Sequence, residues 1–410
     1  MNYNAKISKT ILSLYILLLP ILRYYNLPGG NNLYLLIANI IVIYLIVRKR
    51  YIIINNKLTN GACLFIIWAS VISFIAYNLS EYHEFVQKTS ANNLIVLCDW
   101  VFIAVACCHE IIDYDNFVNI YKWICYILLV YIFLQIVGIH IPGFTMTGRI
   151  PFLDVASEYS IRGRNFGVYP SGMFTRYSSL FIEPSHFSQY MAPFLCLSLF
   201  GYKDIINKNL IIAGMVSALM IMSISGTSII IVMIIWIYYM FTEMKHITKT
   251  KIVLLVALII AFLFCIVLAM QNAGIISMLE RMSNSSDNKV VDRVTRGFQV
   301  FLRLPIIQKI FGIGYQCIYP ASKVYGIEVG YSVADNVKEY VNDVASILVS
   351  FGLIGFMPIG YMVCRGFMGA KKREIAVYIA SLAICLSDCT FGAMWLLLIC
   401  ICISVHKNRL

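Results

Sequence analysis

The stretch Glu183-Pro184-Ser185-His186 places an acid and an imidazole three residues apart at the start of an apolar run. Pro184 is well placed as the first residue of a helix, because its missing N–H needs no partner there. In such a helix Glu183 and His186 share a face, and Tyr190 follows one turn later. A carboxylate or an imidazole at this place could take a proton from a hydroxyl group. The alternative is a capped helix whose histidine is satisfied at a membrane interface.

The polar segment before this helix is basic through arginine alone. It contains Arg149, Arg162, Arg164 and Arg176, and no lysine. The planar fork of arginine suits bidentate binding of phosphate and carboxylate groups. Aromatic side chains are interspersed among these arginines, and such rings suit the faces of sugars. A solvated loop, or a loop in contact with lipid headgroups, would also be basic and aromatic.

A second basic pattern follows further along the chain. Lys289, Arg293, Arg296 and Arg303 recur at spacings of one helical face, with apolar residues between them. This pattern predicts an amphipathic helix. One interpretation is that Arg293 and Arg296 face the first basic segment and clamp a phosphate. The other is a helix that lies on the bilayer with its basic side chains toward the headgroups.

The elements that position these side chains are hydrophobic helices. The chain of 410 residues is 60% hydrophobic and 13% charged, against about 25% charged in soluble domains. A spanning helix needs roughly 20 mostly apolar residues. The predicted spans are 10–26, 32–47, 59–78, 92–112, 117–138, 186–201, 209–225, 227–241, 252–270, 343–363, 375–387 and 390–405. We therefore expect an all-α polytopic membrane protein, with residues 1–410 forming one domain of about twelve transmembrane helices.

The distribution of lysine and arginine predicts the orientation, because these residues crowd short cytoplasmic loops. With both termini in the cytoplasm, more than half of the 32 basic residues face the cytoplasm, and only Arg23 and Lys88 lie near short outer loops. Two long segments, 139–185 and 271–342, then face outward. In the second, Gly312-Ile313-Gly314 indicates a turn, and Asn342 is placed to cap the tenth span.

Metal chemistry is not expected. Most of the thirteen cysteines lie within apolar runs, and no Cys/His ligand spacing occurs. Asp113-Tyr114-Asp115 resembles the metal-binding pair of many sugar-nucleotide transferases, but the topology places it in a short cytoplasmic loop. The first outer loop, 27–32, contains no acid. These features favour a mechanism without metal or other cofactor.

The run from Arg176 to Tyr190, RYSSLFIEPSHFSQY, resembles the signature of Wzy-type polysaccharide polymerases, which extend O-antigens and related bacterial surface glycans. The layout of the whole chain agrees with this resemblance. It has about twelve spans, two long arginine-rich outer loops, the turn at 311–314 after Arg293 and Arg296, and the sequence Gly-Leu-Ile-Gly at 352–355. The specific motif covers only the short run.

The resemblance implies a GT-C-like membrane glycosyltransferase, related to O-antigen ligases, in the bacterial cytoplasmic (inner) membrane. Donor and acceptor would be oligosaccharides on undecaprenyl pyrophosphate at the outer leaflet. The growing chain moves to a new repeat unit, and undecaprenyl pyrophosphate leaves. Besides membrane lipids, a separate chain-length regulator is an expected partner; no nucleotide sugar or nucleic acid is required.

The resemblance and the residues together give a mechanistic hypothesis. Basic side chains would hold the pyrophosphate and stabilise the charge that develops on it. Candidates for this role are Arg176, Arg293 and Arg296, followed by Arg162 and Arg164. Glu183 or His186 would accept the proton of the attacking hydroxyl, and the sequence leaves that choice open. Tyr190 is a further candidate for substrate binding.

Two other functions fit parts of the pattern. An O-antigen ligase would use the same donor with a lipid A-core acceptor, and its layout is similar. A flippase for the lipid-linked repeat would be a transporter. A flippase should carry charged residues along a central cavity through several spans, whereas the basic residues here concentrate in outer loops.

Overall fold

A computed structural model describes residues 3–25, 33–49, 57–83, 90–107, 109, 111–138, 141, 144, 146–150, 153, 168–171, 174–243, 289–327, 341–387 and 393–406. These residues are mostly helical. The helices are α1 (Tyr3–Leu22), α2 (Leu33–Lys49), α3 (Lys57–Asn78), α4 (Ser80–His83), α5 (Ser90–Cys107), α6 (Tyr114–Gly138), α8 (Pro184–Phe200), α9 (Leu210–Met222), α10 (Gly226–Glu243), α13 (Lys289–Arg303), α14 (Ile306–Phe311), α15 (Ile318–Val324), α16 (Asp343–Phe367), α17 (Lys372–Ser387) and α18 (Ala393–His406).

The helical segments agree closely with the hydropathy pattern. Each predicted span within the described ranges coincides with a helix, and the predicted span 252–270 lies outside them. Among the described residues, five helices, α3, α5, α6, α10 and α16, are long and apolar enough to cross a membrane. Shorter apolar helices lie within α2, α9 and α18. The described part of the chain is thus mostly helical, and its apolar helices indicate a membrane-embedded protein.

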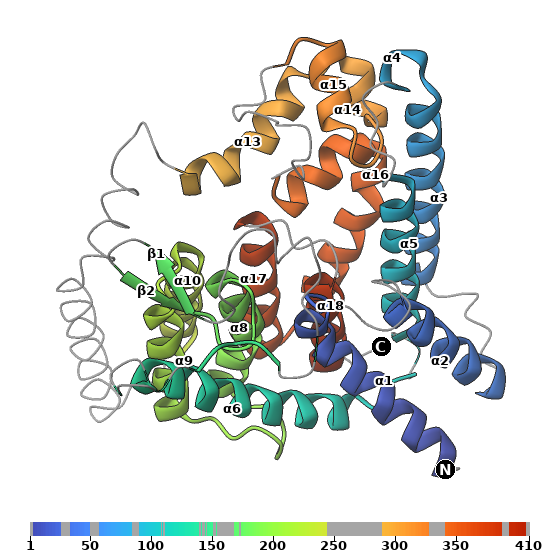
Figure 1. The fold of residues 1–410 in the computed structure, drawn as a ribbon. Helices are drawn as coiled ribbons and strands as arrows, with labels where there is room; N and C mark the ends of the chain where they lie inside the picture. Colours follow the sequence, from blue (N-terminus) through green and yellow to red (C-terminus); the bar gives the residue numbers. More distant parts are fainter. Residues whose placement is uncertain are drawn as a thin grey trace.

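Helix α8 is the centre of one packed group, in which it contacts α9, α10 and α17 (Figure 1). Helices α1, α6 and α18 pack beside this group. A second group consists of α3, α5 and α16, with α14 against α16, and it joins the first through α18 and α17. The fold therefore brings the end of the first helix next to elements from the middle of the chain.

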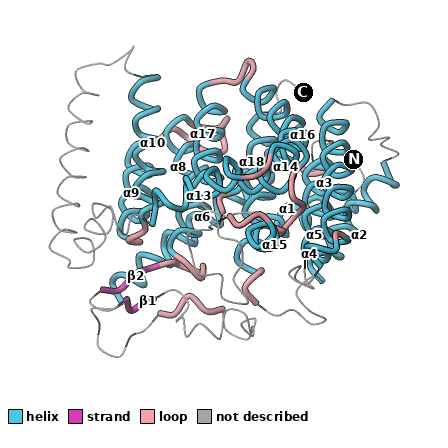
Figure 2. Tube along the Cα trace, turned by 90° about the horizontal axis from the view of Figure 1, so that it is seen from above, coloured by secondary structure: helices cyan, strands magenta, loops and turns pink. Residues whose placement is uncertain are grey.

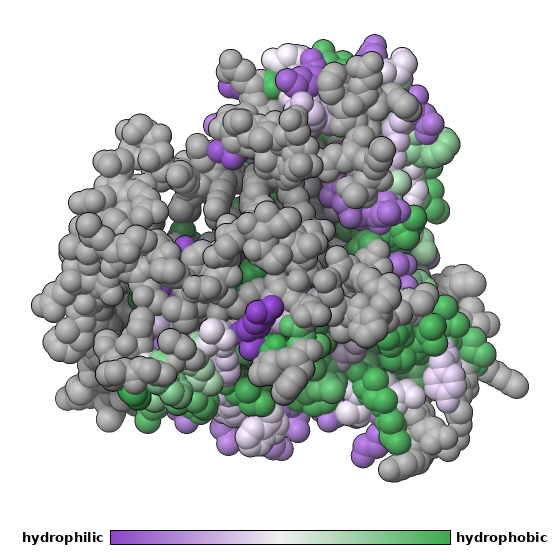
Figure 3. All heavy atoms as spheres, viewed as in Figure 1, coloured by the Kyte–Doolittle hydropathy of each residue, from purple (hydrophilic) through white to green (hydrophobic). Residues whose placement is uncertain are grey.

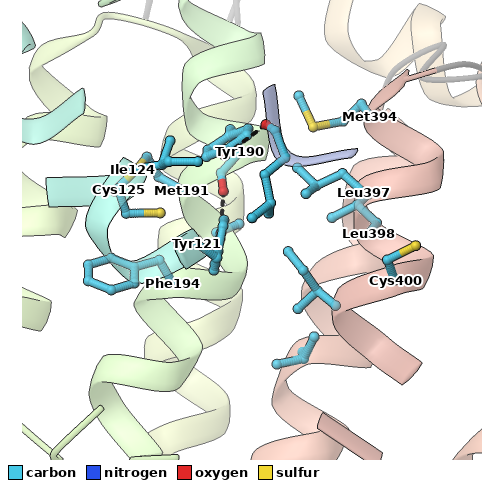
Figure 4. Close-up of a cluster of buried hydrophobic side chains, with 14 of the residues drawn as sticks. Tyr121, Ile124, Cys125, Tyr190, Met191, Phe194, Met394, Leu397, Leu398 and Cys400 are labelled. Carbon is cyan, nitrogen blue, oxygen red and sulfur yellow. Dashed lines mark hydrogen bonds between the residues drawn. The ribbon is translucent and has the colours of Figure 1, made fainter. Parts of the chain in front are cut away.

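Aromatic side chains fill the core around α8. The Tyr121 hydroxyl donates to the Tyr190 carbonyl at 2.5 Å, and the Tyr190 hydroxyl donates to the Leu17 carbonyl at 3.0 Å (Figure 4). Phe194 completes the stack on Tyr121 with an edge-on contact. All three rings are completely buried. These contacts fix α8 against α1 and α6, and the half-buried residues of α8 are His186 in its first turn and Phe200 at its other end.

The surface of the long helices is apolar, as a lipid environment requires. Figure 3 shows hydrophobic side chains over α3 and over the lower face near α6 and α9, with polar side chains near α4 and α15. On α3, Phe74 is 70% exposed and Leu64 is 61% exposed. Exposed large apolar faces on soluble monomers are small, so these faces fit contact with acyl chains.

The two long predicted loops contain more structure than expected. In the first, β1 (Val168–Ser171) and β2 (Phe174–Tyr177) form an antiparallel hairpin at the edge of the molecule (Figure 2). In the second, the predicted amphipathic helix is confirmed as α13, and α14 and α15 follow it. The Asn342 side chain accepts from the Ala345 amide, so the predicted cap of α16 is also confirmed.

Candidate active site at the start of helix α8

Helix α8 begins at Pro184, as the sequence predicts, and Glu183 is its N-cap residue in an extended conformation. Glu183 and His186 are both half-buried, whereas the residues from Phe187 to Leu199 are buried. The Ser185 hydroxyl donates to Glu183 Oε2 at 3.5 Å. An acid and an imidazole therefore stand where the helix leaves the core.

The side chain of Gln135 holds the loop before Glu183 in place through two hydrogen bonds. The backbone amide of Ser179 donates to Gln135 Oε1 at 3.0 Å, and Gln135 Nε2 returns a bond to the Ser179 carbonyl at 3.1 Å. Ser179 has a positive φ of 53°, a conformation that non-glycine residues adopt rarely. A buried amide thus fixes a strained loop, and this loop sets the position of Glu183.

The direct partner of His186 comes from the first helix region. The Tyr24 hydroxyl oxygen lies 2.6 Å from His186 Nδ1, and the two rings stack with an interplanar angle of 15°. Tyr24 is only 1% exposed. Arg23 lies over the Tyr24 ring at 5.1 Å from its centroid. No local sequence pattern identifies Tyr24, which lies 162 positions from His186.

The neighbouring Tyr25 ties a further basic segment to the same place. Its hydroxyl accepts from the Ile150 amide at 2.9 Å and donates to the Gly148 carbonyl at 3.4 Å. Arg149 lies between these two residues and is exposed. The end of α1 therefore holds an exposed arginine near the Tyr24–His186 pair.

Arg176 is fixed at the turn between α9 and α10. Its Nε donates to the Ile224 carbonyl at 3.0 Å, and its side chain is half-buried. Ile224 has a positive φ of 54°, which is an outlier for a β-branched residue. Strained backbone persists where the surroundings determine it strongly, and it is frequent at functional sites.

Three serine hydroxyls join this turn to α8. Ser188, Ser223 and Ser228 are hydrogen-bonded to one another, and all three are completely buried. Ser188 lies in α8 two residues after His186, whereas Ser223 and Ser228 flank the strained Ile224. The cluster therefore connects the turn that holds Arg176 to the turn of α8 that carries His186.

Of the other predicted site residues, the structure places Tyr190 and Arg296 away from the Tyr24–His186 pair. Tyr190 is buried in the core, where its hydroxyl bonds to Leu17, and its contact with substrate stays a prediction. Arg296 is half-buried on α13, which packs on α16 and α17. Arg293 belongs to the same helix, but its side chain lies outside the described residues. Arg162 and Arg164 also lie outside the described residues.

The Asp113-Tyr114-Asp115 motif lies at the start of α6, away from the His186 region. Lys203 Nζ contacts both carboxylate oxygens of Asp115, at 2.5 and 2.7 Å. The Tyr202 hydroxyl donates to the same carboxylate at 3.0 Å. Burial raises the pKa of the Tyr202 phenol, and Asp115 raises it further. In this structure Asp115 forms an ion pair between the first turn of α6 and the turn that follows α8.

The chain matches no known protein family profile, and no curated protein is significantly similar to it in sequence. A half-buried acid, a histidine with a phenol partner and a fixed arginine are all joined to α8 or to the turn that contacts it. This combination can bind an anion and can move a proton.

Proposed function

We propose that the protein is a membrane glycosyltransferase that polymerises undecaprenyl-pyrophosphate-linked oligosaccharide repeats into a bacterial surface polysaccharide, as Wzy-type polymerases do. The proposal includes about twelve spans, a GT-C-like organisation and both termini in the cytoplasm. The observation that carries it is the start of α8, where Glu183 is the N-cap, His186 is bonded to Tyr24, and Ser188 is bonded to Ser228 after the turn that holds Arg176.

In the proposed reaction, arginine side chains supply the positive charge that stabilises the negatively charged leaving group. The Arg176 Nε donates to the Ile224 carbonyl, which orients the guanidinium, and the planar fork of a guanidinium suits phosphate oxygens. Arg293 and Arg296 on α13, with Arg162 and Arg164 in the first long segment, would complete the pyrophosphate site. Preorganised cations of this kind stabilise charge as the bond to the leaving group breaks.

The Tyr24 contact supports a choice between the two proton acceptors. A phenol is a good hydrogen-bond donor, and a neutral imidazole nitrogen is a good acceptor. When the Tyr24 hydroxyl donates to Nδ1, the ring proton of His186 resides on Nε2. His186 then offers an N–H to the substrate and cannot also accept a proton at Nε2. Glu183 is consequently the group we propose as the base.

The proposed step is a substitution at the anomeric carbon of the donor chain. The acceptor hydroxyl oxygen forms a bond to that carbon while the bond from the carbon to the pyrophosphate oxygen breaks. The hydroxyl proton moves to the Glu183 carboxylate, and undecaprenyl pyrophosphate leaves with the electron pair. His186 and Arg176 stabilise the negative charge on the departing oxygen.

Deletion of the gene in its source organism tests the proposed class of reaction. A polymerase predicts that the ladder of surface polysaccharide collapses to single repeat units, because ligation and export continue. Loss of even the single repeat would instead indicate a ligase or a flippase. An unchanged ladder would contradict a role in this pathway.

A further inference from the structure

Helix α14 shows an inverted distribution of polar and apolar side chains. Ile306 is 74% exposed, Ile307 is 66% exposed, and Ile310 and Phe311 are exposed as well. Its two polar residues, Gln308 and Lys309, are half-buried. Water favours the opposite arrangement. The exposed side of this short helix therefore suits a hydrocarbon environment.

The contacts of α14 place its end far from the ends of the neighbouring helices. Phe311 packs on Trp68 of α3, with ring centroids 6.0 Å apart. The following backbone bonds to α16, with the Ile313 and Gly314 amides donating to the Val349 and Ser350 carbonyls. At 1.5 Å per residue, Trp68 lies about 15 Å below the Asn78 end of α3. A hydrocarbon core about 30 Å thick would contain this level.

After Gly314 the chain runs back along α3, toward the Asn78 end of that helix. The Tyr315 amide donates to the Ser73 hydroxyl at 3.0 Å, and the Tyr77 hydroxyl donates to the Tyr315 carbonyl at 2.9 Å. Helix α15 follows and packs on α4, directly after α3. Residues 305–316 thus run inward along α16 and back along α3 (Figure 1).

Three glycines allow this approach. Gly352 interrupts α16 with a φ of 66°, and Gly312 and Gly314 have φ values of 94° and 90°. A Cβ on Gly352 would lie 2.4 Å from the Ile310 carbonyl oxygen, and one on Gly312 would lie 2.3 Å from the Ser350 carbonyl oxygen. The carbonyls that the break in α16 exposes bond to the incoming amides, as backbone at membrane depth requires.

We propose that residues 305–316 form a re-entrant segment and that the exposed face of α14 contacts the acyl chains of the surrounding bilayer leaflet. The face continues the exposed apolar surfaces of α3 and α16, both of which are long enough to span a membrane. Leu302, at the end of α13, is a further exposed apolar side chain in this region, at 68%. The inference does not depend on the proposed enzymatic function.

Quenching by brominated lipids tests this placement. A fluorescent amino acid is introduced singly at Ile306 or Ile310 of the full-length protein, in nanodiscs of phosphatidylcholine brominated at defined depths. Leu353 in α16 is the control for lipid contact, and the exposed Lys323 in α15 is the control for solvent. We expect quenching at 306, 310 and 353 and little at 323. The label at 310 should respond to deeper bromine than the label at 306.

Two results would overturn the inference. Quenching at 306 and 310 as weak as at 323 would exclude contact with lipid. Equal depths for these two labels would show a helix that lies along the interface instead of entering the bilayer. A photo-crosslinking residue at Ile307 identifies the occupant: a lipid adduct supports the inference, whereas crosslinking to a second copy or another protein contradicts it. Because each label is placed separately, a variant that fails to fold leaves the other positions to decide.

Discussion

The start of α8 and the junction of α14 with α16 are built in different ways. At α8, single hydrogen bonds between side chains join Tyr24 to His186 and Arg176 to the turn at Ile224. At the α14–α16 junction, backbone packs on backbone, and glycine is required at the closest approach. A side chain can be removed at the start of α8 without loss of the fold. At the glycines of the α14–α16 junction, in contrast, a side chain cannot be added. Substitutions should therefore separate activity from assembly.

The largest effect should come from Gly352→Ala. The backbone at Gly352, with φ 66° and ψ −173°, is essentially limited to glycine and costs another residue on the order of 1–3 kcal/mol, and the added atom would collide with the Ile310 carbonyl. We expect little folded protein in the membrane, as measured by its amount and by thermal unfolding in detergent. Gly360→Ala is the matched control in the same helix, since its Cβ would meet nothing closer than 3.8 Å. A Gly352→Ala protein as stable as wild type would contradict the requirement for glycine where α14 packs on α16.

At the start of α8, Arg176→Ala should have one of the largest effects on activity. We expect long chains to disappear while the protein remains in the membrane, because loss of one preorganised charge at such a site costs on the order of 10²–10³ in rate. Arg176→Lys should also be impaired, since lysine has no fork. Arg365→Ala, at the far end of α16 where the side chain is exposed, is the control. Normal polysaccharide ladders from both Arg176→Ala and Arg176→Lys would show that Arg176 is not part of the site.

Substitutions at His186 and Glu183 sharpen the assignment of roles. If His186 acts as a donor through Nε2, His186→Gln should keep part of the activity, because its amide N–H reaches a similar position, and His186→Ala should lose more. Glu183→Gln, which removes the base, should cost about 10²–10⁴ in rate. Chain formation by the purified variants measures this. Equal loss in His186→Gln and His186→Ala, with activity kept in Glu183→Gln, would make His186 the base.

The smallest effect should come from Tyr24→Phe, which keeps the ring and removes the hydroxyl. A hydrogen bond of this kind contributes about 0.5–1.5 kcal/mol, so the rate should fall several-fold with little change in thermal unfolding. Within a His186→Ala background the same change should have no effect on the rate, because the partner is gone. The exposed Tyr361→Phe serves as the control. Equal effects of Tyr24→Phe in both backgrounds would show that the two residues act independently.

Hydropathy and local spacing predict most of the helices, because a helix that meets lipid carries its signal in its own sequence. The start of α8 at Pro184 and the Asn342 cap of α16 are equally local and are both confirmed. Helix α14 was not predicted, since six residues are too few to give a period or a span. Its position also depends on a break in another helix, at Gly352.

The same distinction applies to the candidate site. Glu183 and His186 are detectable because they lie three residues apart at a helix start. Tyr24 is not detectable from the sequence, because aromatic residues at helix ends are common in membrane proteins. Its partner, His186, is also far away in the sequence. The strained Ile224 also gives no sequence signal, since its conformation is imposed by the serine cluster and by the packing of α8, α9 and α10.

The most direct test of the central claim is reconstitution of the purified protein in liposomes with undecaprenyl-pyrophosphate-linked repeat units from the source organism. Product length is measured with wild type, Arg176→Ala and Glu183→Gln, without nucleotide sugar. We expect long lipid-linked chains with wild type, and only single repeats with the two variants. Wild-type protein that leaves the repeats unjoined, or variants that polymerise at the wild-type rate, would contradict it.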